Sequence, residues 1–199
     1  KSMGDYATTL PITLLTGKRP SATAANPELA KCKGVRFAVF QEPENDDKIH
    51  VGHMKEITGN DKISARGLYK EPVEFYPQFK TLLTCNKLPR IPSSDGGTWR
   101  RLRVVPFEMV FCENPKAPNE RKMDKRLKEK LDGWTEPFLS ILFNERFKIY
   151  KKNDFKIKEP FKVTECTTAY QKRSDLILEF ANEHLEKTEN KKDKLNFSV

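Results

Sequence analysis

Short apolar runs separated by polar, turn-rich stretches make up the first half of the chain. The runs are rich in β-branched, aromatic and leucine side chains, which favours strands over helices of the same length. Such runs predict strands or extended segments at residues 10–15, 35–40, 63–70, 73–76, 79–86 and 101–107. The pair at 63–70 and 73–76 flanks a Glu-Pro dipeptide and predicts a strand–loop–strand excursion.

Two helical patterns lie between these strands. Asn26 followed by Pro27 is typical of a helix start, with the amide as N-cap and proline in the first turn, and Gly34 marks the end of a helix over 27–33. Residues 48–57 predict a second helix, which ends in a Thr-Gly-Asn-Asp turn cluster. We expect an α/β fold for this part of the chain.

The pattern changes at residues 113–119, where Pro115 and Pro118 stand among polar residues. We place a domain boundary there, between residues 1–113 and residues 114–199. The second part predicts a mainly α-helical region. Its helices are expected at 120–131, 135–147 and 174–187, with a lysine-rich connection at 150–163 and a polar tail.

Composition narrows the class of protein. In 199 residues, 37 Lys and Arg stand against 28 Asp and Glu, which gives a net charge of +9 and is compatible with binding to nucleic acid or with a solvated basic surface. No apolar run approaches the roughly 18 residues of a membrane span, and we expect no membrane association. The cysteines show neither zinc-ligand nor disulfide-framework spacing, so we expect reduced thiols in an intracellular protein; they are Cys32, Cys85, Cys112 and Cys166.

Polar side chains follow two of the predicted strands. Glu42 and Glu44 come directly after the strand at 35–40, where a carboxylate can hold Mg²⁺ through water and orient an attacking water. Asn86 ends the strand at 79–86, where an amide can position water near a γ-phosphate. Taken singly, the glutamates also fit a surface turn and Asn86 a turn former.

Arginines follow a glycine-rich loop further along. Arg100 and Arg101 come directly after Gly96-Gly97-Thr98-Trp99, and guanidinium groups so placed suit contact with the phosphates of a neighbouring subunit. Surface ion pairs or nucleic-acid contacts are the alternatives for these side chains.

The order of the motifs is more specific than any one of them. Residues 55–70 (KEITGNDKISARGLYK) resemble the B-prime motif of superfamily-three helicases, and they follow a strand similar to Walker B. Residues 82–89 (LLTCNKLP) resemble motif C, and residues 95–107 resemble the arginine-finger segment. The chain from about residue 5 to 111 thus resembles the primase–helicases of nucleocytoplasmic large DNA viruses and related phage and plasmid primases.

The resemblance implies an AAA+ P-loop NTPase core, followed by a helical C-terminal region that is either winged-helix-like or a collar. It implies ATP and Mg²⁺ as cofactors. Glu42, with Glu44, would be the Walker B acid that holds Mg²⁺ through water, and Asn86 would be the sensor of the γ-phosphate. Arg101 or its neighbour Arg100 would act in trans on the next subunit's ATP.

The resemblance also implies a hairpin, at 63–76, that points into the channel of a homohexameric ring and grips single-stranded DNA. Its cations are Lys62, Arg66 and Lys70, and Tyr69 is available to stack on a base. Lys55 and Asp61 match the motif, and an alternative role for them is to anchor the base of the hairpin.

Two departures from the family pattern are visible. Walker A, G-x-x-x-x-G-K-[ST], does not occur in the sequence, and Gly17-Lys18-Arg19 lacks the required earlier glycine, so we expect the phosphate-binding loop upstream. The acids after the first buried strand are interrupted by Pro43, which leaves the metal-side and base-side roles unassigned.

We therefore expect part of an ATP-hydrolysing replicative DNA helicase that moves on single-stranded or forked DNA as a hexamer, with this chain inactive without the upstream loop. Expected partners are further copies of the chain, an upstream primase domain and a polymerase. If the protein is viral, we expect it in the host cytoplasm or nucleus. The alternative is a non-catalytic nucleic-acid-binding or oligomerisation module.

Overall fold

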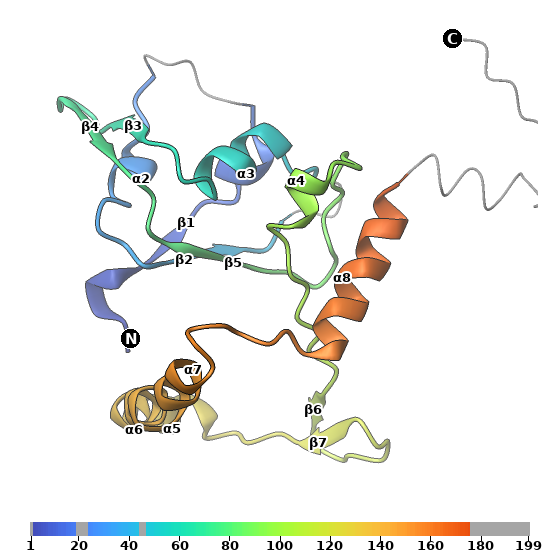
Figure 1. Ribbon diagram of the computed structural model, residues 1–199. Coiled ribbons are helices and arrows are strands. Elements are labelled where there is room, and N and C mark those ends of the chain that lie inside the picture. The colour runs from blue at the N-terminus through green and yellow to red at the C-terminus, as the bar shows by residue number, and fades with distance from the viewer. Residues whose placement is uncertain (1, 19–23, 44–46, 176–199) are drawn as a thin grey trace, which may run out of the picture.

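A three-stranded parallel sheet forms the centre of the structure, a computed structural model that describes residues 2–18, 24–43 and 47–175. The strand order is β1 (Ala7–Leu10), β2 (Phe37–Gln41) and β5 (Lys80–Thr84). The register pairs Leu10 with Phe40 and Phe40 with Leu83. All three strands therefore end at the same edge of the sheet (Figure 1), and the expected α/β class is confirmed.

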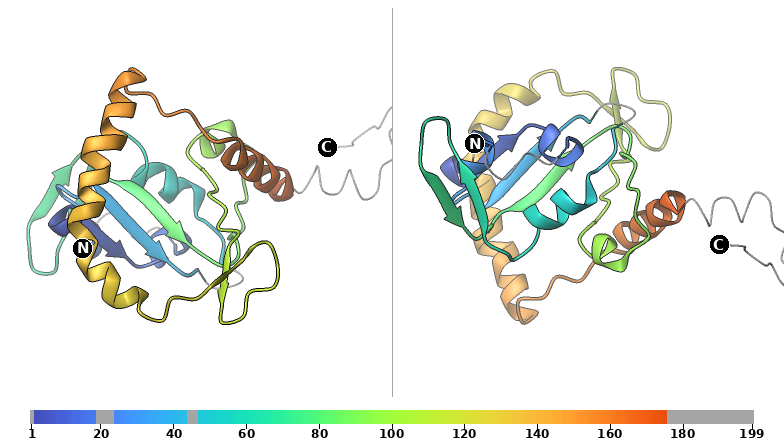
Figure 2. Two further views of the ribbon diagram at one scale, coloured as in Figure 1. Left: turned by 90° about the horizontal axis from the view of Figure 1, so that it is seen from below. Right: turned by 90° about the horizontal axis from the view of Figure 1, so that it is seen from above.

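Short helices cover one face of this sheet. α1 (Thr13–Thr16) and α3 (Val51–Ile57) lie over it, as the view from above in Figure 2 shows. On this face Ala38 and Phe40 of β2 are fully buried. The residues predicted at 10–15 divide between β1 and α1, because Pro11 has no backbone N–H to continue a ladder and the next residues turn into a helix that buries two leucines.

The predicted helix at 27–33 is shorter than expected, with α2 spanning Pro27–Ala30. Its start is as predicted, because the Asn26 side chain accepts a hydrogen bond from the Leu29 N–H at 3.0 Å. Turns lead from α2 to Gly34, whose φ of +84° is a conformation that glycine adopts at low cost. The chain then enters β2.

An antiparallel hairpin confirms the prediction for residues 63–76. β3 (Ile63–Arg66) pairs with β4 (Pro72–Phe75), and Ile63 lies opposite Phe75. The hairpin packs against α2, and the Asn26 N–H donates to the Arg66 carbonyl at 2.8 Å. Because β4 leads within four residues to the start of β5, the hairpin joins the sheet at its amino edge (Figure 1).

The predicted strand at 101–107 is wrong. α4 (Gly96–Trp99) lies inside the expected loop, and residues 103–109 run without a strand ladder. The Val104 N–H donates to the Thr167 hydroxyl at 2.9 Å instead of to a strand, and Pro106 has no N–H to donate. The pattern of alternating apolar residues there does not find a partner strand among the described residues.

The C-terminal part differs in three places from the prediction. Residues 120–122 form β7 (Glu120–Lys122), which pairs with β6 (Val110–Cys112), because the loop folds back through bonds from the Lys116 and Ala117 N–H groups to the Glu120 carboxylate. A helix begins only at α5 (Leu127–Gly133). The expected helix at 135–147 is present and longer, as α6 (Thr135–Ile141), a π-helical turn (Leu142–Arg146) and α7 (Phe147–Lys152).

The third difference is α8 (Phe161–Ser174), which begins inside the expected connection directly after Pro160. The helix predicted at 174–187 lies almost wholly outside the described residues. The helices α5 to α7 lie on the opposite side of the sheet from α3, as the view from below shows (Figure 2). No residue from 105 to 160 is buried. The C-terminal part reaches the core again at α8, where Tyr170 is buried.

Candidate active site

The carboxyl edge of the sheet brings two of the predicted site residues together. Glu42 directly follows β2, and its N–H donates to the Thr84 carbonyl at the end of β5, at 3.0 Å. Asn86 stands two residues beyond that carbonyl, and both side chains are exposed. The edge therefore presents a carboxylate and an amide to solvent, while Glu44 lies outside the described residues.

The backbone of Glu42 is strained. Its φ is +42°, a left-handed conformation that costs a non-glycine residue roughly 1–2 kcal/mol. Pro43 disfavours the right-handed helical conformation at the preceding residue, and the bond to Thr84 fixes the position of Glu42. Strained residues of this kind cluster at functional sites, which makes this glutamate a candidate on structural grounds as well.

The two predicted arginines lie at the end of α4 and differ in availability. Arg101 is half-buried, and its guanidinium donates to the Gly97 carbonyl of its own helical turn. Arg100 is exposed, and its guanidinium makes no hydrogen bond or ion pair within the described ranges. Of the two, Arg100 is therefore the side chain free to reach another molecule.

Asp95 caps the helix that carries these arginines. Its carboxylate accepts from the Gly97 N–H at 2.7 Å and from the Thr98 hydroxyl at 2.8 Å, and it pairs with Lys55 of α3. The Lys55 ammonium, followed by the Thr98 and Gly97 hydrogen bonds, holds the pKa of Asp95 well below its usual range. Lys55 is thus tied to the arginine segment and not to the base of the hairpin.

The four predicted DNA-binding residues lie along the hairpin. Lys62 stands at its base and pairs with Glu74 of β4 at 2.6 Å, and the hydrogen bond and charge of Glu74 raise the pKa of Lys62. Arg66 ends β3, and Tyr69 and Lys70 form the tip. Tyr69 has a φ of +55° and is fully exposed. The tip therefore offers an aromatic ring and a cation to solvent.

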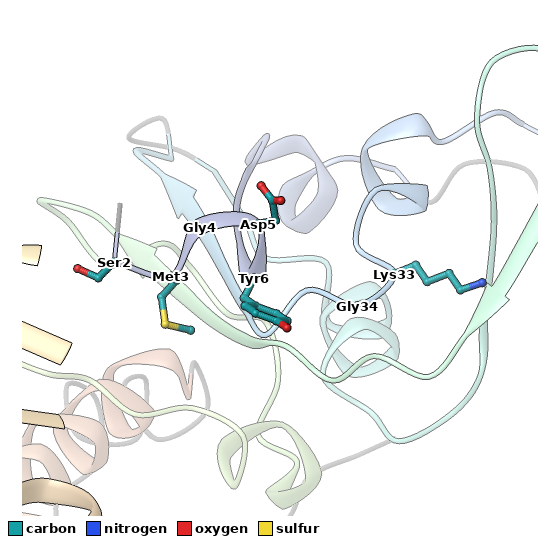
Figure 3. Close-up of a pocket in the computed structure, with 7 residues that line it drawn as sticks. All are labelled: Ser2, Met3, Gly4, Asp5, Tyr6, Lys33 and Gly34. Carbon is teal, nitrogen blue, oxygen red and sulfur yellow. The ribbon is translucent and has the colours of Figure 1, made fainter. Parts of the chain in front are cut away.

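The hairpin and the carboxyl edge lie toward opposite ends of the sheet (Figure 1). A pocket of about 700 Å³ also opens away from Glu42 and Asn86, around the starts of β1 and β2. Figure 3 shows its lining, which comes from the N-terminal turn with Met3 and Tyr6 and from Lys33 and Gly34 in the segment before β2. None of the predicted site residues lines this pocket.

Sequence reasoning missed the residues that hold α4 in place. Thr98 and Trp99 are buried, the indole Nε1–H donates to the Ser93 carbonyl at 2.7 Å, and the Trp99 ring meets that of Tyr170 edge-on. The sequence signal for Trp99 was its apolar character inside a polar, glycine-rich loop. Tyr170 had no such signal, since its partners lie some 70 or more positions away in the chain.

The described residues contain no cluster of three or more His, Cys, Asp or Glu side chains placed to hold a metal ion. Among the helices of residues 2–18, 24–43 and 47–175, none has the length and apolarity to cross a membrane.

The chain is similar to known proteins over nearly its whole length. Residues 18–101 match a protein family described as "Family of unknown function (DUF5906)". The chain is 41% identical over 201 residues to a "Putative helicase" of Acanthamoeba polyphaga mimivirus and 41% identical over 203 residues to a "Putative helicase" of Frog virus 3, covering 96% and 94% of this chain. A "Putative primase" of African swine fever virus is 30% identical over 191 residues, or 92% of this chain.

The chain is similar to helicase and primase proteins of large DNA viruses. This confirms the resemblance drawn from the motif order. The matches to these viral proteins extend well beyond residue 111 into the C-terminal part, which the motifs did not cover. The chain spans about a fifth of the length of these viral relatives, with 21%, 20% and 20% of them covered.

Proposed function

We propose that the chain is part of an ATP-driven DNA helicase of superfamily three, with an AAA+ core that works as a homohexameric ring. The observation that carries the proposal is the shared edge of the sheet, where Glu42 and Asn86 follow neighbouring parallel strands and the Glu42 N–H bonds to the strand that leads to Asn86. Ligands of open α/β sheets bind at this carboxyl edge. The similarity to viral helicases and primases supports the same reading.

The donor set at this edge suits Mg²⁺ and water. A carboxylate and an amide supply hard oxygen ligands, which Mg²⁺ prefers and usually contacts through its own waters. Glu42 would hold the metal through water and orient the attacking water, and Asn86 would position that water against the γ-phosphate of ATP. Bound Mg²⁺ would supply neutralising charge on the phosphates. Walker A does not occur in these 199 residues, so in this proposal the phosphate-binding loop would belong to another part of the polypeptide.

An arginine completes the proposed site from the neighbouring subunit. We assign this role to Arg100, because the Arg101 guanidinium already donates to the Gly97 carbonyl and is half-buried. A guanidinium at the γ-phosphoryl group stabilises the charge of the transition state. Each nucleotide would then lie between two subunits.

The hairpin is the proposed contact with single-stranded DNA. Tyr69 would stack on a base, while Arg66 and Lys70 would contact the phosphate backbone. Lys62 contributes less to DNA binding in this proposal, because its ammonium group is already paired with the Glu74 carboxylate. The hairpin and the nucleotide edge lie toward opposite ends of the sheet, which suits a machine in which hydrolysis at one end moves a strand at the other.

The proposed helicase also has expected partners, a DNA substrate and a location. Further copies of the chain form the ring, single-stranded or forked DNA is the substrate, and a primase domain and a polymerase are the replication partners. We place the protein inside the host cell, in the cytoplasm or nucleus. A non-catalytic nucleic-acid-binding module is the alternative outcome of the test below.

The test compares two glutamine variants in the complete protein. Glu42→Gln keeps the size of the side chain but removes its charge, and we expect the kcat of DNA-stimulated ATP hydrolysis to fall by at least about 100-fold. Glu136→Gln on the exposed surface of α6 is the matched control and should stay within about twofold of the unaltered protein. Equal ATPase rates for the two variants would exclude the role assigned to Glu42. DNA binding without any ATPase in the unaltered protein would favour the binding module.

A further inference from the structure

α8 reaches the arginine segment through Tyr170. This residue is 8% exposed, and its hydroxyl donates to the Pro89 carbonyl. Its ring meets the Trp99 ring edge-on, with the centroids 5.3 Å apart and an angle of 86° between the planes, a favourable geometry for two aromatic rings. Burial raises the pKa of Tyr170 above its usual range, so the hydroxyl stays protonated and remains a donor.

Because Arg100 directly follows Trp99 in the chain, contacts that fix Trp99 also restrict the position of Arg100. Trp99 is 5% exposed and is also fixed by the bond from its Nε1–H to the Ser93 carbonyl. α4 is a single turn, too short to be stable without such packing. The direction in which Arg100 leaves the helix therefore depends on the contacts that Ser93 and Tyr170 make with the indole.

The chain beyond Arg100 is fixed by the same helix. The Thr167 hydroxyl, one turn before Tyr170, accepts from the Val104 N–H at 2.9 Å. Glu159, just before α8, accepts from the Arg103 Nε–H at 2.6 Å. Contacts from α8 and its entry thus hold the chain both before and after Arg100 and Arg101.

We propose that α8 positions the trans-acting arginine segment, with Tyr170 as its anchor. The inference rests on the function proposed above and gives the C-terminal region a role within it. Tyr170 is a positioning residue, because its ring packs against Trp99 and its hydroxyl bonds to the Pro89 carbonyl, and it makes no hydrogen bond to Glu42 among the described residues. It also lies near Cys85, the residue before Asn86. Loss of the anchor should therefore weaken the arginine that a subunit gives to its neighbour, while that subunit's own Glu42 stays in place.

The first measurement is ATP hydrolysis by variants of the complete protein. For Tyr170→Ala we expect kcat to fall at least about tenfold, because small displacements of a catalytic group cost up to about 100-fold in rate. Tyr170→Phe keeps the ring against Trp99 and should retain at least about a third of the rate. Phe161→Ala removes an aromatic ring from the same helix at a site that is 79% exposed, and it should stay within about twofold of the unaltered rate.

The second measurement separates positioning from loss of folding. Glu42→Gln subunits keep Arg100 and α8, whereas Tyr170→Ala subunits keep Glu42. A one-to-one mixture reassembled into rings should recover up to about a quarter of the unaltered rate, because random mixing gives that share of interfaces with a sound Glu42 facing a sound arginine segment. A Tyr170→Ala subunit that had merely unfolded would give no recovery.

Three results would overturn the inference. They are a Tyr170→Ala rate equal to that of Phe161→Ala, a Tyr170→Phe rate as low as that of Tyr170→Ala, and a mixture no more active than its two components. An Arg100→Ala and Glu42→Gln mixture tests the trans geometry itself. If that mixture recovers activity and the Tyr170 mixture does not, the proposed function stands and the positioning role of α8 fails. Absence of ATPase in the unaltered protein would overturn the proposed function and this inference with it.

Discussion

Replacement of Trp99 by phenylalanine tests how strongly α4 is held. The change keeps an aromatic ring but removes the indole N–H, which donates to the Ser93 carbonyl at 2.7 Å. It also removes part of a ring that is 5% exposed and packs edge-on against Tyr170. The substitution therefore affects the contact between the loop at 89–95 and α8 without altering any predicted site residue.

The expected cost follows from these two losses. A half-buried carbonyl left without its donor costs about 1–2 kcal/mol. A cavity of about 40 Å³, at about 24 cal/mol per Å³, adds about 1 kcal/mol. The free energy of unfolding should fall by about 2–3 kcal/mol, which lowers Tm by about 5–10 °C in a protein of this size.

The assay is urea and thermal unfolding of the 199-residue protein, followed by far-ultraviolet circular dichroism. The chain has two tryptophans, and Trp134 on α5–α6 is about half exposed, so Trp134→Phe is a matched control with an expected change within about 0.5 kcal/mol. Tryptophan fluorescence in the Trp134→Phe background then reports on Trp99 alone. Equal destabilisation by the two substitutions would refute the packing of α4 against α8.

Three further predictions concern other contacts. For Asp95→Asn, the Tm should lie below that of the unaltered protein at pH 7, and this deficit should shrink below about pH 4. The reason is that a carboxyl with a depressed folded pKa stabilises the fold above its unfolded pKa and loses this contribution as the pH falls toward the folded pKa. A deficit that does not change with pH would contradict this. Asn26→Ala should lower the free energy of unfolding by about 1 kcal/mol, measured by urea denaturation, since it removes the cap of α2, and no change would mean that Leu29 finds another acceptor. Lys70→Ala should reduce the slope of log K against log salt concentration for single-stranded DNA binding by about 0.7, measured by fluorescence anisotropy. Lys128→Ala on the exposed α5 should leave this slope unchanged. Equal slopes for the two variants would show that the hairpin tip does not contact DNA.

Local patterns were enough for the elements that depend on nearby residues. The strands at 37–41 and 80–84, the hairpin and the Asn26 cap were predicted because β-branched runs, turn residues and capping amides act within a few positions. The same local patterns predicted that Glu42 and Asn86 stand at the ends of their strands. Patterns failed at 101–107, where an alternating apolar run lacks a ladder because its N–H group at Val104 is taken by a side chain 63 positions away.

The sequence by itself determined the order of the motifs, the α/β class and the residue types at the candidate site. Only the tertiary structure decided that Arg101 bonds back to its own turn while Arg100 stays free, and that Lys55 pairs with Asp95. It also decided that the Tyr170 ring of α8 packs edge-on against Trp99. The physical reason is that some of these contacts join residues 40 to 81 positions apart, and the others depend on the direction of a side chain. A local pattern of apolar and polar residues specifies neither of these.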